Sequence, residues 1–185
     1  TMAAFGEWKA GAASGAMNAV IVTLGTGIGG GIVMGGELQR GANGFAGEIG
    51  HMVVQHDGEL CVCGRRGCWE RYASGSALRM LSGGLSGEEV FAAASSGDGH
   101  AMSVVATFAD WVAVGLASLT NICDPEVIVI GGGVVQSFEF VLESVSKSFS
   151  AALYSSESRP HPALHVAALG ERAGAIGCAL FMTQG

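Results

Sequence analysis

The stretch AVIVTLGTGIGGGIVM, Ala19 to Met34, decides the fold that this sequence predicts. Residues 19–24 are apolar and largely β-branched, which is typical of a buried strand, and GIVM reads as a second strand. The run between them, Gly25 to Gly30, fits the dinucleotide pattern G-x-G-x-x-G, but that pattern requires a helix directly after the glycines. We therefore predict a β-hairpin whose bare backbone N–H groups, with the Thr26 hydroxyl, approach phosphate oxygens. A hairpin that binds no ligand is the alternative.

A second strand runs into glycines at EVIVIGGGVV, residues 126–135. At Gly131 to Gly133 the base or ribose of a nucleotide can lie flat against bare backbone. The sequence contains no Gly-Lys-Ser or Gly-Lys-Thr, which excludes a P-loop. Two glycine turns about a hundred residues apart in one domain favour a nucleotide site, because such sites assemble at strand ends in α/β folds.

The remaining periodic segments predict helices and one further strand. Helices are expected over residues 2–13, 73–81, 87–95, 104–122, 138–153 and 173–182, and a last strand over ALHVAAL, residues 163–169. Asp124-Pro125 ends the long helix, and Cys178 on the last helix reads as a small core residue. Strands that alternate with helices carrying apolar faces predict an α/β layer fold.

Three of the five cysteines fall within the short run CVCGRRGCWE. Zinc takes four N or S ligands in a tetrahedron, and Cys61, Cys63 and Cys68 supply three of them. The fourth is expected to be an upstream histidine, His51 or His56. Disulfides are the alternative, but three clustered cysteines cannot pair evenly and disulfides are rare in the cytoplasm. A complete set of four protein ligands leaves no open position, so we expect a structural zinc.

The charge and composition exclude several classes of partner. Nine basic residues against sixteen acidic ones give a formal charge of −7, which argues against binding to nucleic acid or to an anionic membrane surface. Only 14% of residues are charged and 49% are hydrophobic, so much of the chain should be buried. The apolar window 104–123 contains polar residues and reads as a buried helix rather than a membrane span. No secretion signal is visible at the N-terminus, and a cytoplasmic location is expected.

Taken together, the motifs resemble those of a known family. LGTGIGGGI, GANGFAGEIGH, CVCGRRGCWE, DPEVIVIGGGV and RAGAIGCALF occur in this order. They resemble the ROK family of bacterial sugar kinases and sugar-responsive repressors, and its glucokinases most of all. The resemblance covers essentially the whole chain. It implies an actin/hexokinase-like fold in which residues 1–185 form the single, ribonuclease-H-like C-terminal domain, with a zinc and sugar loop inserted at 41–72.

The resemblance also implies roles for individual residues. It selects His51 over His56 as the fourth zinc ligand, and in the family this histidine touches the sugar as well. Glu48 and Glu70 match the family's sugar-binding carboxylates, and Asn43 lies in the same loop. Trp69 reads as a packing residue or, beside Glu70, as a shield of the sugar pocket. The remaining matches concern the nucleotide: Gly25, Thr26, Gly27, Gly29 and Gly30 correspond to the phosphate hairpin, and Gly131, Gly132 and Gly133 to the adenosine segment.

One departure concerns catalysis. Family members carry an Asn-Asp-x-Asn motif whose Asp is the general base, and in this chain that Asp would fall just before Thr1. The N-terminal lobe and its Asp-x-Gly-x-Thr phosphate loop are also absent from the sequence. The chain is therefore expected to be a fragment without a catalytic residue of its own. Since general-base catalysis typically contributes about 10² to 10⁴ in rate, we expect little or no turnover by this chain alone.

The resemblance implies an ATP-dependent hexose kinase of carbohydrate metabolism and glycolysis. Mg²⁺-bound ATP would transfer its γ-phosphoryl group to the 6-hydroxyl of a sugar, glucose first. Mannose, fructose or an N-acetylated amino sugar is the alternative substrate. The alternatives outside catalysis are a sugar-sensing repressor, whose helix-turn-helix would lie upstream, and a zinc-folded dimerisation domain. A homodimer is expected in each case, because the apolar helix over 104–122 and the low surface charge favour association.

Overall fold

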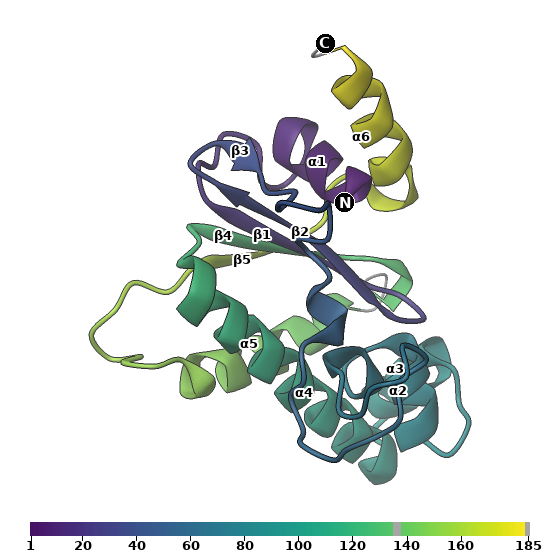
Figure 1. The fold of residues 1–185 in the computed structure, drawn as a ribbon. Helices are drawn as coiled ribbons and strands as arrows, with labels where there is room; N and C mark the ends of the chain where they lie inside the picture. The colour runs from purple at the N-terminus through teal and green to yellow at the C-terminus, as the bar shows by residue number, and fades with distance from the viewer. Residues whose placement is uncertain (135–137, 184–185) are drawn as a thin grey trace.

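The computed structural model describes residues 1–134 and 138–183, and its centre is one mixed β-sheet between two layers of helices (Figure 1). The five strands lie in the order β3-β2-β1-β4-β5. Their bounds are β1 Ala19–Leu24, β2 Ile28–Met34, β3 Glu37–Leu38, β4 Val127–Gly131 and β5 Ala163–Val166. The helices are α1 Met2–Ala10, α2 Gly75–Leu81, α3 Gly87–Ser95, α4 Gly99–Cys123, α5 Phe138–Ala152 and α6 Ala173–Met182, with short 3₁₀ turns η1 Ile49–His51, η2 Trp69–Arg71 and η4 Gly170–Arg172.

The hairpin predicted from the glycine-rich run is confirmed. β1 and β2 pair antiparallel, with Leu24 opposite Ile28, so only residues 25–27 form the turn. The second strand begins earlier than predicted, and Gly29 and Gly30 lie within it rather than in the turn. β4 runs parallel to β1 on its other side. The turn after β1 and the glycines after β4 therefore lie at the same end of the sheet.

The alternation of side chains along β1 builds two cores, one on each face of the sheet. Val20 and Val22 pack into the larger core with α4 and α5, whereas Ile21 packs into the smaller one with α1. Figure 1 shows α1 and α6 on one side of the sheet and α4 and α5 on the other, with α2 and α3 beside α4. The sheet is therefore covered on both faces, as the apolar, β-branched composition of β1 and β4 requires.

The long helix α4 begins five residues earlier than predicted. Asp98 caps it, and its Oδ1 accepts a hydrogen bond of 2.7 Å from the backbone N–H of Ala101. Asp124 ends the helix in the left-handed conformation at φ 42°. Among the described residues, α4 alone has the length and apolar composition of a membrane span, but 56% of its most apolar window is buried inside the structure. The reading as a core helix agrees with this burial.

The first helix is shorter than predicted because of Glu7. The helix ends at Ala10 rather than Ala13, since the N–H of Ala12 donates to Oε2 of Glu7 over 2.9 Å. The same carboxylate accepts hydrogen bonds from the backbone N–H groups of Ala168 (3.1 Å) and Leu169 (2.8 Å). Glu7 is only 1% exposed, and these three donors compensate its burial. The carboxylate thus fixes α1 to the chain that leads from β5 to α6.

Two expectations about the C-terminal part were wrong. The last strand ends at Val166, three residues before the end of the predicted run, because Ala168 and Leu169 turn to Glu7. Cys178 is exposed rather than in the core. Helix α6 carries no charged residue, and this apolar composition predicted a buried helix. Within the described part of the chain, however, only Ala173 and Gly177 of this helix are buried.

Candidate functional site

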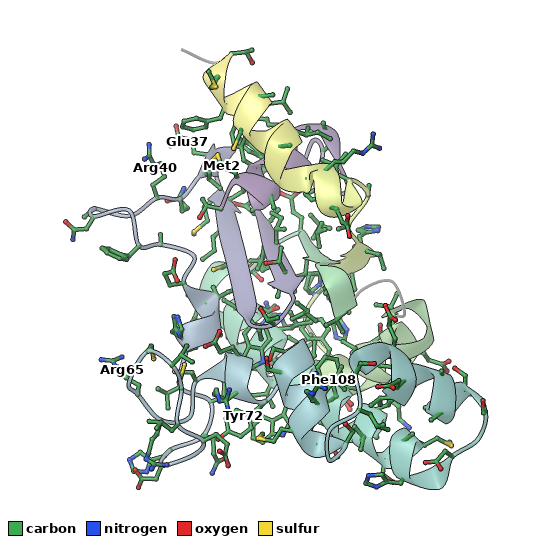
Figure 2. The ribbon with its side chains drawn as sticks, turned by 90° about the vertical axis from the view of Figure 1, so that its right-hand side faces the viewer. Met2, Glu37, Arg40, Arg65, Tyr72 and Phe108 are labelled. Atoms are coloured by element: carbon green, nitrogen blue, oxygen red, sulfur yellow. The ribbon has the colours of Figure 1, made fainter. Side chains whose placement is uncertain are left out.

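The loop between β3 and α2 is held to the helical layer by Trp69. Its indole N–H donates to the carbonyl of Trp111 on α4 over 2.7 Å, and its ring fills the space that Gly115 leaves. Trp69 is fully buried, which agrees with its reading as a packing residue. Isolated bridges between Val53 and Cys68 and between Leu60 and Arg66 fold the loop back on itself. Figure 2 shows Arg65 at the outer edge of this loop, away from the buried Phe108 of α4.

The loop gathers four potential metal ligands. The donor atoms of His51, Cys61, Cys63 and Cys68 all lie within 4.8 Å of one another. The Sγ atoms of Cys63 and Cys68 are 3.6 Å apart, and Sγ of Cys61 is 3.7 Å from Nδ1 of His51. These separations are close to the edge of about 3.8 Å that a tetrahedron with Zn–S bonds of about 2.3 Å requires. His56 lies outside the cluster, exposed and paired with a neighbouring aspartate.

The charge state of the cluster depends on whether a cation is bound. Burial raises the pKa of the Cys61 thiol from 9.0 to about 12. Burial also raises the pKa of Cys68, whereas a hydrogen bond from the backbone of Arg65 lowers the pKa of exposed Cys63. Three adjacent thiolates would repel one another, so a divalent cation is needed to balance their charge. The donor set therefore fits Zn²⁺, with Cys61, Cys63, Cys68 and His51 as its ligands.

The four sugar-site candidates differ in their surroundings. Glu70 is largely buried, and its Oε1 lies 3.0 Å from Sγ of Cys61 and 3.8 Å from Nδ1 of His51. Glu48 is exposed directly before η1, where its carbonyl accepts a hydrogen bond from the N–H of His51. Asn43 is exposed on the preceding turn. The structure thus brings Glu70 and His51 together and places Glu48 and Asn43 on the open side of the same loop.

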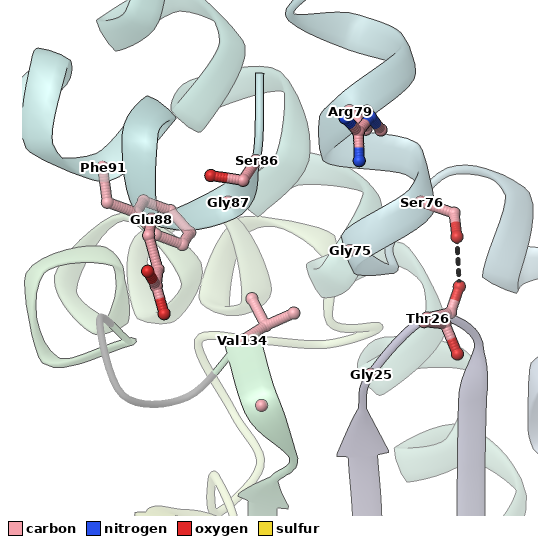
Figure 3. A pocket seen from close by; sticks show the side chains of 11 residues that line it. Gly25, Thr26, Gly75, Ser76, Arg79, Ser86, Gly87, Glu88, Phe91 and Val134 are labelled. Carbon is pink, nitrogen blue, oxygen red and sulfur yellow. Dashed lines mark hydrogen bonds between the residues drawn. The ribbon is translucent and has the colours of Figure 1, made fainter. Parts of the chain in front are cut away.

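The two glycine turns line one pocket. Gly25 and Thr26 from the hairpin and Gly133 from the segment after β4 border a cavity of about 490 Å³ (Figure 3). Helix α2 closes one side, where the Gly75 N–H donates to the carbonyl of Gly25 over 2.7 Å and the Ser76 hydroxyl donates to the carbonyl of Thr26 over 2.6 Å. The pocket therefore combines segments that lie far apart in the sequence, at the end of the sheet where β1 and β4 terminate.

The other predicted nucleotide glycines lie outside this pocket. Gly29 and Gly30 are strand residues, and a Cβ at position 30 would approach Cδ1 of Ile49 to 2.3 Å, so this glycine admits η1 against the sheet. Gly131 and Gly132 border a separate cavity of about 150 Å³ beside Glu7. Gly27 faces Glu70, whose Oε2 would lie 2.5 Å from a Cβ at that position.

Several pocket residues could not be found from sequence motifs. Arg79 of α2 and Ser86, Glu88 and Phe91 at the start of α3 border the cavity. Ser86 caps α3 in a capping box with Glu89, a local pattern that marks the start of the helix. It carried no information about the pocket, because only the packing of α2 and α3 beside the hairpin brings these side chains there. In Figure 3 Glu88 and Arg79 lie on different sides of the cavity.

Comparisons with known proteins agree on one family. The sequence model of the ROK family matches residues 1–184. Over 199 aligned positions the chain is 37% identical to a glucokinase of Streptomyces coelicolor, covering 96% of this chain and 63% of that protein. It is also 33% identical to the xylose repressor of Bacillus subtilis, covering 94% of this chain and 46% of the repressor.

The solved structures show the same fold. A ROK family glucokinase from Streptomyces griseus, crystallised with glucose and AMPPNP, matches with a TM-score of 0.93 and 39% identity, covering all of this chain and 66% of that one. A ROK hexokinase from Thermus thermophilus matches with a TM-score of 0.89 and 36% identity. The expected actin/hexokinase-like α/β fold is thereby confirmed. The chain spans less than two thirds of the length of the two glucokinases.

Proposed function

This chain belongs to the ROK family, and from that premise we propose that it is the C-terminal domain of an ATP-dependent hexose kinase, with glucose as the first candidate substrate. One observation carries the proposal. Gly25 and Thr26 line the same cavity as Gly133, about a hundred residues later in the chain, at the strand ends where α/β folds bind nucleotides. The similarity to kinases for glucose and for N-acetyl-D-glucosamine supports a sugar as the acceptor.

The pocket suits the donor nucleotide. Its volume of about 490 Å³ is in the range of small-molecule sites, and bare backbone at Gly25 and Gly133 allows close approach of phosphate and ribose. Arg79 adds a positive charge at the rim of a chain whose net charge is −7. We propose that Mg²⁺-ATP is the donor, with its triphosphate at the hairpin and its adenosine towards Gly133.

The sugar would lie beside the metal cluster. Glu70 and Glu48 would accept hydrogen bonds from sugar hydroxyls, and His51 would contact the sugar from the cluster, with Asn43 assisting. Zn²⁺, held by Cys61, Cys63, Cys68 and His51, would stabilise this loop without entering the chemistry, since four protein ligands leave no open position. The protein's contribution at this half of the site is the orientation of the acceptor hydroxyl towards the hairpin.

The reaction moves one phosphoryl group. The oxygen of the sugar 6-hydroxyl forms a bond to the γ-phosphorus, the bond from that phosphorus to the β–γ bridging oxygen breaks, and ADP leaves. The hydroxyl proton passes to a general base, which we expect on an Asp that immediately precedes Thr1. Residues 1–185 would form one domain with the sugar loop inserted at 41–72, and a preceding lobe would complete the cleft by closing over both substrates.

A sugar-sensing repressor is the second candidate, because the xylose repressor matches over 94% of this chain. The two functions share the fold and differ in what precedes Thr1 and in phosphoryl transfer. For either function we propose a cytoplasmic homodimer.

The test is an assay of ADP release by the full-length polypeptide with glucose, mannose, fructose, N-acetylglucosamine and xylose, with the 185-residue chain as control. We expect glucose-dependent turnover by the full-length protein and little or none by the control. Sugar binding without ADP release, together with sugar-dependent release of operator DNA, would establish the repressor instead.

A further inference from the structure

A single carboxylate lies between the metal cluster and the glycine hairpin. Oε1 of Glu70 accepts a hydrogen bond from the thiol of Cys61 over 3.0 Å. Oε2 accepts one from the backbone N–H of Ile28, the first residue of β2, over 3.4 Å. The Glu70 side chain is only 14% exposed, so both contacts form in a partly dehydrated environment where they are stronger than in water.

The backbone around Glu70 connects the same two features. Residues 68–76 begin with a metal ligand, Cys68, and end with Gly75 and Ser76, which donate to the carbonyls of Gly25 and Thr26. Between them Trp69 is fully buried against α4. One short segment therefore connects the cluster to the residues on either side of Gly27 in the hairpin. The buried Trp69 fixes the position of this segment on α4.

The glycine at position 27 matches this arrangement. A Cβ there would lie 2.5 Å from Oε2 of Glu70. Apart from the two chain neighbours of Gly27, Glu70 is the only residue in the described part of the chain within 4 Å of that position, so the lack of a side chain allows the carboxylate to approach. The hairpin is shaped to receive Glu70 as well as a phosphate. This relationship is separate from the sugar contact proposed for Glu70, because it exists between protein groups alone.

We propose that Glu70 is a positioning residue that links the metal site to the glycine hairpin, so that loading the metal site increases the affinity for the nucleotide even without sugar. A bound metal takes Cys61 as a thiolate, so the thiol hydrogen bond to Oε1 is lost. The metal still fixes Cys68, two residues before Glu70, and with it the backbone that holds the carboxylate against the N–H of Ile28. The fixed carboxylate then orients the N–H groups of the hairpin before the nucleotide arrives, which reduces the ordering cost of binding. By linkage, the nucleotide increases the affinity for the metal by the same factor. The inference rests on the proposed nucleotide site.

The test compares zinc-loaded and chelator-stripped full-length protein in the absence of sugar. Calorimetry gives the affinity for Mg²⁺-AMPPNP, and hydrogen–deuterium exchange reports on the amides of residues 25–29 without any nucleotide. We expect stripping to weaken nucleotide binding at least about fivefold, the lower end of typical coupling between sites, and to speed exchange in the hairpin.

Variants separate the linkage from general loss of structure. Glu70→Ala should bind nucleotide with the weaker affinity in both states, because the carboxylate that transmits the effect is gone. Glu59→Ala removes an exposed carboxylate from the same loop and should keep the full dependence on zinc. If Glu70→Ala fails to fold, Gly27→Ala takes its place: its methyl group displaces Oε2, and it should also lose the dependence on zinc.

Each outcome decides between the claims. Equal affinity and equal hairpin exchange with and without zinc would overturn the linkage. Dependence on zinc that persists in Glu70→Ala would show that another path carries it. Absence of nucleotide binding in both states, with hairpin exchange still dependent on zinc, would overturn the proposed donor site but keep the link through Glu70. Absence of both effects would overturn both.

Discussion

The indole of Trp69 occupies the place that a side chain at Gly115 would take. A Cβ at position 115 would lie 2.0 Å from the Trp69 ring, and the indole N–H reaches the carbonyl of Trp111 one helical turn earlier on α4. This contact joins α4, which covers the sheet, to the loop that carries Glu70 and the four potential metal ligands. The position of the site thus depends on the absence of one side chain in the core helix.

Gly115→Ala should destabilise the protein through this contact. The added methyl group cannot be accommodated without moving Trp69, and overpacking of a core typically costs about 1–3 kcal/mol. Urea unfolding measures the loss. Val114→Ala changes the partly exposed neighbouring residue and should cost less than about 1 kcal/mol. Equal losses of stability in the two variants would contradict the conclusion that Trp69 packs in the space left by Gly115.

Cys68→Ser should abolish stoichiometric zinc binding. Cys68 is buried and lies 3.6 Å from Cys63 within the four-donor cluster, and a structural zinc site needs all four ligands. Metal analysis of the purified protein should give about one zinc per chain for the wild type and none for the variant. Cys178→Ser, at an exposed position outside the cluster, is the control and should retain the metal. Zinc retained by Cys68→Ser would contradict the assigned ligands.

The metal-free protein should lose stability as the pH rises above about 9. Burial holds the pKa of Cys61 in the folded state at about 12, against an ordinary 9.0, so in this window the unfolded chain ionises this thiol and the folded chain does not. The unfolded state then binds fewer protons, and the free energy of unfolding falls by at most about 1.4 kcal/mol per pH unit from this group. Chemical unfolding between pH 8 and 10 measures the slope. Cys61→Ala should reduce it, and an unchanged slope in that variant would rule out Cys61 as the source.

Glu7→Ala should be among the most destabilising single substitutions in the chain. It leaves the partly buried N–H groups of Ala12, Ala168 and Leu169 without their acceptor. An unsatisfied donor costs about 1–3 kcal/mol when it is fully buried and less where water reaches it. Thermal unfolding should show a large drop in Tm. Glu37→Ala removes an exposed carboxylate from the edge strand and should change Tm little. A small effect of Glu7→Ala would mean that water replaces the carboxylate.

Local chemistry explains why much of the fold was predictable. The β-branched run before Gly25 and the glycine turn specified the hairpin, and apolar periodicity ended by Asp124-Pro125 specified the long helix. Cysteine spacing predicted three metal ligands, because the turn that brings Cys61, Cys63 and Cys68 together is itself local. The choice of His51 over His56 followed only from the family resemblance, and the structure places His51 in the cluster.

The sequence could not predict features that depend on tertiary packing. The burial of Glu7 depends on backbone donors about 160 residues away, and no local pattern announces them. Arg79 and Glu88 reach the pocket only because α2 and α3 pack beside the hairpin. Cys178 was misplaced because an apolar helix was equated with a buried one, whereas the described part of the chain leaves half of the α6 residues exposed.

Glucose-dependent ADP release by the full-length protein, measured for the wild type, Glu70→Gln and Glu59→Gln, tests the central claim most directly. The account predicts turnover with glucose, a loss in kcat/KM of at least about tenfold in Glu70→Gln, as expected for a hydrogen bond to a charged group, and wild-type activity in Glu59→Gln. No ADP release with any sugar, or turnover of glucose that is indifferent to Glu70→Gln, would contradict it.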